Sequence, residues 1–378
     1  MHYYKISLND ASALFKKMGC DKTGINIMSK KSEINTLYIK DLHVGAANIL
    51  KQDALSIGAD LAVPSGVIVA KDKYVDAVLI GNSKHFEMLS KKELAQPFGL
   101  KQLAHDLKKF VNFKKFDTRI MGVINANEDS FYQKSRFDGS FAIEKIENMI
   151  LDGANIIDIG AVSSRPGSLP VDKETELNRI KPIVDALYQQ NLYDRVTFSI
   201  DSYEPAVLRY VLDRGFKIVN DITGMINDEV AKVTASYDAS IVIMHMQNNP
   251  VNMQANPEYS DVMMDVSSFF EKQIDKANDF GIKDIILDVG IGFGKDLNHN
   301  LTLLKNMEHF RSFGYEVLIG ASRKSMIDKI APSGVEERLP GTLAIHLDSI
   351  RKGASIVRCH DVKEHYQAIK TQEAILSI

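Results

Sequence analysis

Short hydrophobic runs alternate with longer amphipathic segments along the part of the chain that follows residue 117. The runs are rich in β-branched residues, and the segments between them have helical spacing of apolar positions, which is typical of repeated βα units. Most runs are apolar on both faces, as in parallel strands covered on both sides. They predict strands at Arg119–Asn125, Ile156–Gly160, Val196–Asp201, Ile218–Asp221, Ile241–Met246, Ile285–Gly290, Val317–Ser322 and Ile356–Asp361.

These βα units, spread over about 260 residues, predict a (β/α)8 TIM barrel, because that is the usual size of the fold. An open, doubly wound sheet is the main alternative. The chain has no clear nucleotide-binding turn after the first predicted strand, and this absence favours the closed barrel.

Polar side chains stand at the end of nearly every predicted strand. They are Asn125, Asp158, Asp201, Asn220, Asp221, His245, Asp288, Ser322, Arg323, Lys324, Arg358 and His360. In a (β/α)8 barrel the C-terminal strand ends converge on one face, where active sites are built. Turn chemistry explains one or two such residues, whereas acidic, amide and basic groups at nearly every end predict a functional site.

Residues 1–116 predict a smaller mixed α/β domain. The expected elements are a helix through Lys17 capped by Asn9 or Asp10, a strand at Leu37–Ile39, a helix at Val44–Ile57, a hairpin of Gly66–Ala70 with Val75–Ile80, and a helix at Leu100–Phe110. No catalytic constellation is recognisable, and the lysines are not interleaved with aromatic residues as in RNA-binding surfaces. We expect an accessory domain docked on the barrel. A sharper alternative is a domain that contacts mobile loops or a partner protein.

Charge locates the boundary between the two parts. The chain of 378 residues holds 46 Lys and Arg and 49 Asp and Glu, and a protein that binds nucleic acid by neutralising phosphates would be more basic. Residues 1–116 carry 18 Lys, no Arg and 11 acidic residues (18 − 11 = +7), whereas the remainder carries 28 basic and 38 acidic residues (28 − 38 = −10). The sequence therefore predicts one domain at residues 1–112 and a barrel at 117–378.

Cysteine content and hydropathy bear on the cellular setting. The only cysteines are Cys20 and Cys359, so neither a disulfide framework nor a cysteine zinc site can be built. The N-terminal residues lack the apolar stretch of a signal peptide. No window approaches the ~18 uncharged apolar residues of a membrane span. We expect a soluble protein of the reducing cytoplasm.

The strand ends lie in motifs that resemble those of a known family. The motifs are IMGVINANEDSF at 120–131, GANIIDIGAVSSRPGS at 153–168, FSIDSY at 198–203, IVNDITG at 218–224, IMHMQ at 243–247, LDVGIGFGK at 287–295, GASRKS at 320–325 and VRCHDV at 357–362. In this order they resemble the dihydropteroate synthases of the pterin-binding family, whereas residues 1–116 lie outside the resemblance. The resemblance implies a barrel enzyme, commonly a homodimer, that condenses a dihydropterin pyrophosphate with 4-aminobenzoate to give dihydropteroate and pyrophosphate.

The resemblance implies a pterin site built from strand ends. A pterin presents ring N–H, amino and carbonyl groups, which call for carboxylates, an amide and a cation. The implied pterin-binding residues are Asp201, Asn220, Asp288 and Lys324, with Met244 and Phe293 as walls of the slot. For Asp201 and Asp288, the alternative is a helix N-cap, because each closes a strand just before a turn.

The resemblance also implies an anion pocket for the leaving pyrophosphate, whose developing charge must be met by cations. Arg358 and His360 form this pocket in the family, and Asn125 contacts a magnesium ion. Mg²⁺ suits an oxygen-rich site that is completed by substrate phosphates. The alternative for His360 is a packed histidine with a satisfied ring.

Two loops depart from the family's pattern. The first lacks the usual Thr-Pro pair but keeps Asp129 and Phe131; the second keeps Ser163, Arg165 and Pro166 and has Ser164 in place of threonine. These loops close over the pyrophosphate and form the aminobenzoate site in the family. We therefore expect altered affinity for aminobenzoate and altered response to sulfonamides. The residues expected in catalysis are Asn125, Ser164, Arg165, Lys324, Arg358 and His360.

Two other functions remain open from the sequence. A methyltetrahydrofolate-dependent methyltransferase shares the barrel and the pterin carboxylates. A methyl donor has no pyrophosphate, however, so the Arg358–His360 pair argues against it. A pterin-binding protein that has lost catalysis through its altered loops is the other alternative.

Overall fold

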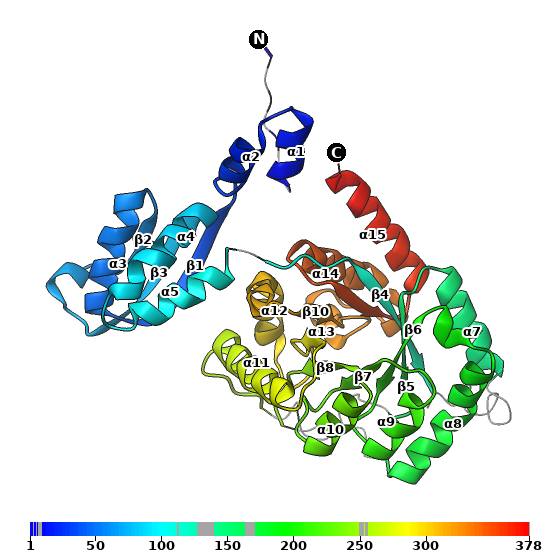
Figure 1. The fold of residues 1–378 in the computed structure, drawn as a ribbon. Helices are drawn as coiled ribbons and strands as arrows, with labels where there is room; N and C mark the ends of the chain where they lie inside the picture. The colour runs from blue at the N-terminus through cyan, green and yellow to red at the C-terminus, as the bar shows by residue number, and fades with distance from the viewer. Residues whose placement is uncertain are drawn as a thin grey trace. The chain divides into compact units, whose positions relative to one another are not determined.

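The computed structural model describes residues 1–378 except 3, 5, 7–9, 112, 127–139, 163–170, 249–252, 254–255 and 378. It contains two compact units, which divide after Lys114 (Figure 1). None of the helices in the described part of the chain is long and apolar enough to cross a membrane.

The second unit is a closed barrel of parallel strands, so the predicted (β/α)8 fold is confirmed. The strands are β4 (Arg119–Asn125), β5 (Ile156–Gly160), β6 (Thr197–Asp201), β7 (Ile218–Asp221), β8 (Ser240–Met244), β9 (Ile285–Asp288), β10 (Glu316–Ile319) and β11 (Ile356–Cys359). Their order around the barrel is β10-β11-β4-β5-β6-β7-β8-β9, and closure comes from the pairing of β11 with β4. The strands β8 to β11 end earlier than predicted, so His245, Ser322 and His360 lie in the loops that follow them.

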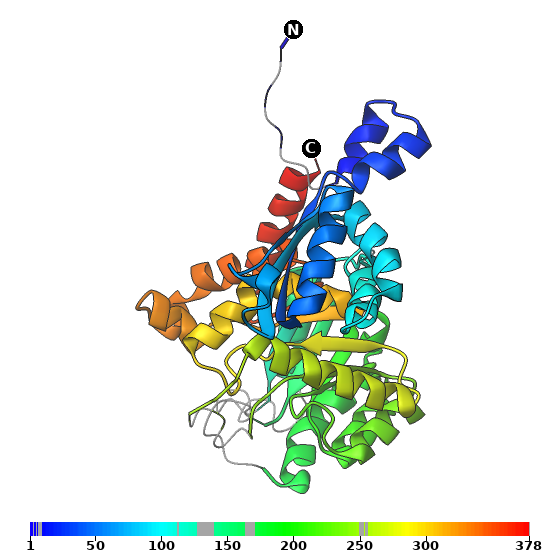
Figure 2. The same ribbon diagram turned by 90° about the vertical axis from the view of Figure 1, so that its left-hand side faces the viewer.

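Helices surround the barrel on its outside in both views (Figures 1 and 2). The α-helices are α7 (Ser140–Leu151), α8 (Lys173–Gln189), α9 (Pro205–Leu212), α10 (Asp228–Ser236), α11 (Val262–Asp279), α12 (Leu297–Lys305), α13 (Ser325–Ile330), α14 (Leu339–Arg351) and α15 (Val362–Leu376). Short 3-10 helices are η3 (Leu192–Asp194), η4 (Met307–Phe313) and η5 (Val335–Glu337).

A cluster of apolar side chains from the strands is buried in the barrel unit. Its members are Met121, Ile156, Ile218, Val242, Ile286, Leu318 and Ile356. Such a packed layer fills the interior of a (β/α)8 barrel. The polar strand ends therefore lie beyond a closed apolar core, at the C-terminal ends of the strands.

The first unit has a three-stranded antiparallel sheet in the order β1-β3-β2. Its elements are α1 (Ala11–Lys17), α2 (Lys22–Ser29), β1 (Ile34–His43), α3 (Val44–Ile57), β2 (Asp60–Ala62), η1 (Val67–Val69), β3 (Tyr74–Asn82), α4 (Ser83–Lys92), η2 (Glu93–Ala95) and α5 (Leu100–Lys109). The helix predicted at Val44–Ile57 has these bounds in the structure. Asp10 caps α1, since its side chain accepts from the Ala13 amide at 3.1 Å, as expected for one of the two candidate caps; Asn9, the other candidate, lies outside the described residues.

The predicted hairpin of Gly66–Ala70 with Val75–Ile80 is wrong. Gly66–Ala70 contains the 3-10 turn η1, and β3 pairs with β1 and β2 instead. The physical reason is backbone conformation, since Gly66 and Ala70 have φ values of 91° and 53° and cannot belong to an extended strand. The apolar run around Ile68 imitates a strand, but this side chain is exposed.

Candidate active site

Arg358 joins two carboxylates at the centre of the strand ends. From β11, its Nε donates to Asp158 Oδ2 at 2.7 Å, and its Nη2 donates to Asp201 Oδ2 at 2.9 Å. Asp158, on β5, also accepts from Ser199 Oγ at 2.6 Å and from Asn220 Nδ2 at 3.0 Å. Three strands besides β11 thus contribute to one buried polar cluster.

Burial and the ion pairs act in opposite directions on the pKa values of Asp201 and Arg358. Burial raises the pKa of Asp201 to about 7, even though Arg358 acts to lower it. Burial also acts to lower the pKa of the Arg358 guanidinium, but Asp158 and Asp201 outweigh this effect and raise it. Asp201 can therefore carry a proton near neutral pH and either donate or accept a hydrogen bond.

Neither Asp201 nor Asp288 is a helix N-cap. Glu204 caps α9 and Asp296 caps α12. Asp288 Oδ1 instead accepts from the Gly290 amide at 2.8 Å. The capping alternative is therefore wrong. Both carboxyl groups are buried at strand ends and are not used to cap a helix.

Lys324 lies beside the strand end of Asp288. Its Nζ donates to the Ile291 carbonyl and lies 4.1 Å from the centroid of the Phe293 ring. Burial lowers the pKa of Lys324 to about 7, opposed by the charge of Asp288. Met244, buried on β8, is the cross-strand partner of Asp288. A carboxylate, an ammonium group, an aromatic ring and a thioether thus gather around the end of β9.

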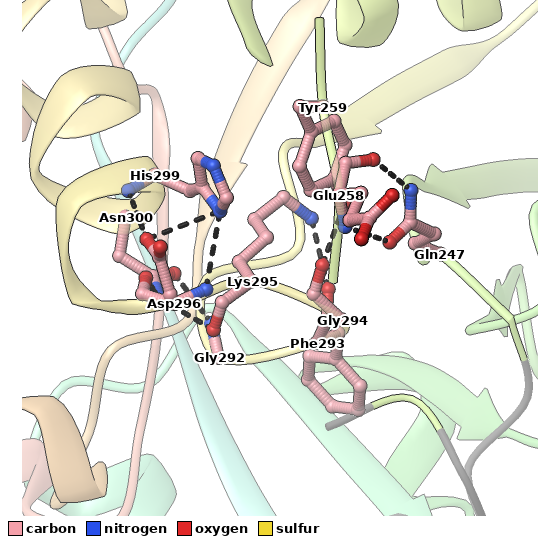
Figure 3. A network of polar contacts seen from close by, with 10 residues as sticks. All are labelled: Gln247, Glu258, Tyr259, Gly292, Phe293, Gly294, Lys295, Asp296, His299 and Asn300. Carbon is pink, nitrogen blue, oxygen red and sulfur yellow. Dashed lines mark hydrogen bonds and ion pairs between the residues drawn. The ribbon is translucent and has the colours of Figure 1, made fainter. Parts of the chain in front are cut away.

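The glycine-rich loop after β9 is held in place by Lys295. Its buried Nζ donates to the carbonyl oxygens of His245, Gly290 and Phe293 at 3.0–3.1 Å and lies 2.9 Å from His245 Nδ1. Figure 3 shows this side chain reaching the Phe293 carbonyl. Asn300 Oδ1 accepts from the Gly292 amide at 2.7 Å. The position of Phe293 is therefore set by a buried lysine that was not among the predicted site residues.

His360 and Ser322 connect the loops after β10 and β11. Ser322 Oγ accepts from the His360 amide at 3.3 Å and lies 2.9 Å from His360 Nδ1. When the hydroxyl donates to Nδ1, the ring proton lies on Nε2. Burial, with the charges of Arg358 and Arg323, lowers the pKa of His360 to about 4. A neutral His360 whose Nε2 donates is suited to binding an anion.

Some polar strand ends have structural roles. The carboxylate of Asp221 accepts from the Thr223 hydroxyl and from the amides of Thr223 and Met225, so it holds its own turn. Arg323 binds Asp361 through Nε at 3.1 Å and Nη2 at 2.6 Å. These contacts shape the loops and leave Arg358 as the guanidinium in the central cluster.

The donor set bears on a metal ion. Among the described residues, no three His, Cys, Asp or Glu side chains are grouped so as to hold a metal. Asn125 is half-buried at the end of β4 and offers one amide oxygen. Such a site fits Mg²⁺ when substrate phosphates and water supply the other ligands.

The predicted residues Asp129, Phe131, Ser163, Ser164, Arg165 and Pro166 lie outside the described residues. Two residues without a predicted binding role, Asp158 and Lys295, lie at the centre of the contacts. The sequence signal for Asp158 was its place among the polar strand ends. The sequence signal for Lys295 was its place at the end of the glycine-rich run Gly290–Lys295, where it is the only charged residue.

Comparison with known proteins decides the family. The pterin binding enzyme family matches residues 121–360, which include all the strand ends described above. This chain belongs to that family. A bifunctional dihydropteroate synthase/dihydropteroate reductase of Helicobacter pylori is 40% identical over 361 residues, 95% of each chain. The dihydropteroate synthase of Escherichia coli is 38% identical over 261 residues, 68% of this chain and 92% of its own.

A solved structure agrees with the family assignment. The dihydropteroate synthase of Clostridium difficile, crystallised in the presence of pteroic acid, has a TM-score of 0.64 and 37% identity. The match covers 71% of this chain and 99% of that one. The match to the Escherichia coli relative covers 68% of this chain, whereas the match to the Helicobacter pylori relative covers 95% and therefore includes the first unit.

Proposed function

We propose that this protein is a dihydropteroate synthase. It condenses 6-hydroxymethyl-7,8-dihydropterin pyrophosphate with 4-aminobenzoate to give 7,8-dihydropteroate and pyrophosphate. The observation that carries the proposal is the buried cluster of Asp158, Asp201 and Arg358, which places a guanidinium between carboxylates at the barrel's strand ends. Family membership and the names of the relatives support the same reaction.

The pterin is proposed to bind between the ends of β6, β7 and β9. Asp201 and Asp288 bind its N–H and amino groups, while Lys324 and Asn220 donate to its carbonyl and ring nitrogen atoms. Phe293 covers one side of the flat ring. Because these groups are already held by hydrogen bonds of the protein, little reorganisation is needed when the substrate binds.

Bond breaking is proposed to precede bond making. The bond between the pterin methylene and the pyrophosphate oxygen breaks, and its electron pair leaves with pyrophosphate. Arg358 and the Nε2 proton of His360 stabilise the developing charge on the leaving oxygens. The aminobenzoate nitrogen then attacks the electron-poor methylene and afterwards loses a proton to solvent.

Mg²⁺ is proposed as the cofactor, with Asn125 as its protein ligand. Bound with the substrate's phosphates, the ion would neutralise part of their charge. The residues Ser163, Ser164, Arg165 and Pro166, with Asp129 and Phe131, are proposed to complete the aminobenzoate site.

A pyrophosphate-release assay tests the function. Release over many turnovers should require the pterin pyrophosphate and aminobenzoate, and omission of Mg²⁺ should reduce it strongly. Arg358→Met should abolish release, whereas Arg195→Met, which alters an exposed pair with Glu147, should leave it unchanged. A wild-type protein that binds the pterin substrate but releases no pyrophosphate would instead support the non-catalytic pterin-binding alternative.

The altered loops lead to a second, finer proposal about aminobenzoate. Because the first loop lacks the family's usual Thr-Pro pair, we propose that aminobenzoate binds with altered affinity and that the response to sulfonamides is altered as well. Steady-state kinetics with aminobenzoate and one sulfonamide measure this directly. Family-typical values for both compounds would reject the proposal.

We also propose that the chain reduces dihydropteroate. The supporting observation is that the Helicobacter pylori relative, whose name includes a reductase, matches 95% of this chain and thus its first unit as well. Reduction of the remaining pterin C=N bond needs a hydride on carbon and a proton on nitrogen, so a reduced nicotinamide nucleotide is the natural donor. Oxidation of NADPH or NADH that depends on dihydropteroate tests it.

Deletion of residues 1–110 separates two roles for the first unit. Loss of reduction with retained synthase activity would assign reduction to the first unit. Unchanged activities would leave it an accessory domain. A homodimer in the cytoplasm is proposed for the whole protein, and light scattering after gel filtration measures the oligomeric state.

A further inference from the structure

Two histidines outside the predicted site lie in contact behind it. His346 on α14 and His365 on α15 are each 1% exposed, and His346 Nδ1 lies 2.9 Å from His365 Nε2. The ends of this pair reach two loops of the site. Ala321 N lies 3.0 Å from His346 Nε2, and Asp361 O lies 2.6 Å from His365 Nδ1.

We call this series of hydrogen bonds, from the Ala321 amide through the two imidazoles to the Asp361 carbonyl, the relay. The groups at its two ends fix the position of each ring proton. The Ala321 amide can only donate, so His346 Nε2 must be the unprotonated nitrogen. His346 Nδ1 then carries the ring proton and donates to His365 Nε2, and His365 Nδ1–H donates to the Asp361 carbonyl. Both rings must be neutral for this arrangement, and burial lowers the pKa of each, as the arrangement requires.

The relay joins the two loops that carry the proposed anion pocket. Ala321 directly precedes Ser322, and Asp361 directly follows His360. The same loops are joined through Ser322 with His360 and through Arg323 with Asp361. The loops after β10 and β11 are thus connected by two sets of contacts, one between side chains of the loops themselves and one through the buried imidazoles.

We propose that His346 and His365 are positioning residues that set the spacing of these loops and thereby the affinity of the anion pocket for pyrophosphate. The proposal rests on the proposed synthase function. Neither ring touches the substrate; each acts through a backbone group. His346 holds the Ala321 amide, whose displacement would move Ser322, the hydrogen-bond partner of His360. His365 holds the Asp361 carbonyl, whose displacement would move His360.

Substitutions of His346 separate the two ends of the relay. The amide of glutamine reaches the position of Nε2, so His346→Gln can still accept from Ala321 while its contact with His365 is lost. The shorter amide of asparagine reaches the position of Nδ1, so His346→Asn can still donate to His365 but releases Ala321. The two variants are matched in polarity and in the loss of one hydrogen bond.

Calorimetric titration of the full-length protein with pyrophosphate and Mg²⁺, and separately with 6-hydroxymethylpterin, provides the measurement. His346→Asn should weaken pyrophosphate binding about fivefold, the equivalent of one hydrogen bond of about 1 kcal/mol. The affinity for 6-hydroxymethylpterin should change by no more than about twofold, which corresponds to under half the free energy of one hydrogen bond. His346→Gln should stay close to the wild type for both ligands.

A second variant covers the other end of the relay, in case His346→Asn does not fold. His365→Gln keeps an acceptor for His346 but releases the Asp361 carbonyl, and it should show the same selective loss of pyrophosphate affinity. Pyrophosphate binding equal to the wild type in both releasing variants would overturn the proposal, as would an equal loss for both ligands. A wild-type protein that shows no synthase turnover would instead overturn the proposed function.

Discussion

Replacement of Arg358 by methionine would leave two buried carboxylates facing each other. The Arg358 side chain is 23% exposed, whereas those of Asp158 and Asp201 are 0% and 9% exposed. Methionine retains much of the aliphatic volume but removes the guanidinium that both carboxylates share. The change therefore tests the electrostatics of the cluster with little change in packing.

The expected cost is large because the carboxylates cannot reach water. Removing one partner of a buried ion pair costs about 3–5 kcal/mol. The cost is limited by protonation of Asp201, whose pKa is already raised to about 7. In the variant this pKa rises further, so native Asp201 keeps its proton at pH 8, where the wild type has lost it. The two proteins thus differ by one bound proton only between pH 7 and pH 8. The loss of unfolding free energy caused by the substitution should therefore be larger at pH 8 than at pH 6 by about 1.4 kcal/mol, the value of one proton over one pH unit.

Urea unfolding of both proteins at pH 6 and pH 8 measures these quantities. Arg195→Met is the matched control, because its pair with Glu147 is about half exposed on both sides and such surface pairs contribute about 0–1 kcal/mol. The reasoning is refuted if Arg358→Met costs no more than the control. It is also refuted if the cost does not increase with pH.

Two further substitutions test the loop after β9. Gly290→Ala would place a Cβ 1.9 Å from the His245 carbonyl oxygen at a φ of 68°, whereas the control Gly281→Ala, at a φ of 83°, meets no atom within 4 Å. Only Gly290→Ala should lose pterin binding as well as stability. Equal effects of the two variants in thermal unfolding and pterin titration would contradict this. The pKa of Lys295 is lowered to about 7, so the native protein releases a proton that the unfolded chain retains, and this stabilises the fold as pH rises above 7. Lys295→Met should therefore reduce the gain in unfolding free energy between pH 7 and pH 9 by roughly 1.4 kcal/mol per pH unit. The pKa of Lys324 is lowered in the same way, so the part of the gain that comes from Lys324 should remain. An unchanged gain in the variant would refute this explanation.

Local patterns were sufficient for most of the fold. The alternation of β-branched runs with helical segments predicted the strands of the barrel, and β4, β5 and β7 have the predicted bounds. These patterns are local, because each depends on which faces of one segment are covered. The pattern misled at Gly66–Ala70, where an apolar run forms a turn because its two ends adopt positive φ.

The sequence by itself determined that polar groups end the strands and that they match a pterin-binding family. It did not determine how these groups pair. Asp158 and Arg358 are 200 residues apart, and they meet because the pairing of β11 with β4 closes the barrel. Likewise, nothing in the sequence distinguishes His346 and His365 from other helical residues. They meet because α14 and α15 bury them against each other. The tertiary structure decided these contacts, since a buried charge or imidazole depends on partners that are remote in the chain.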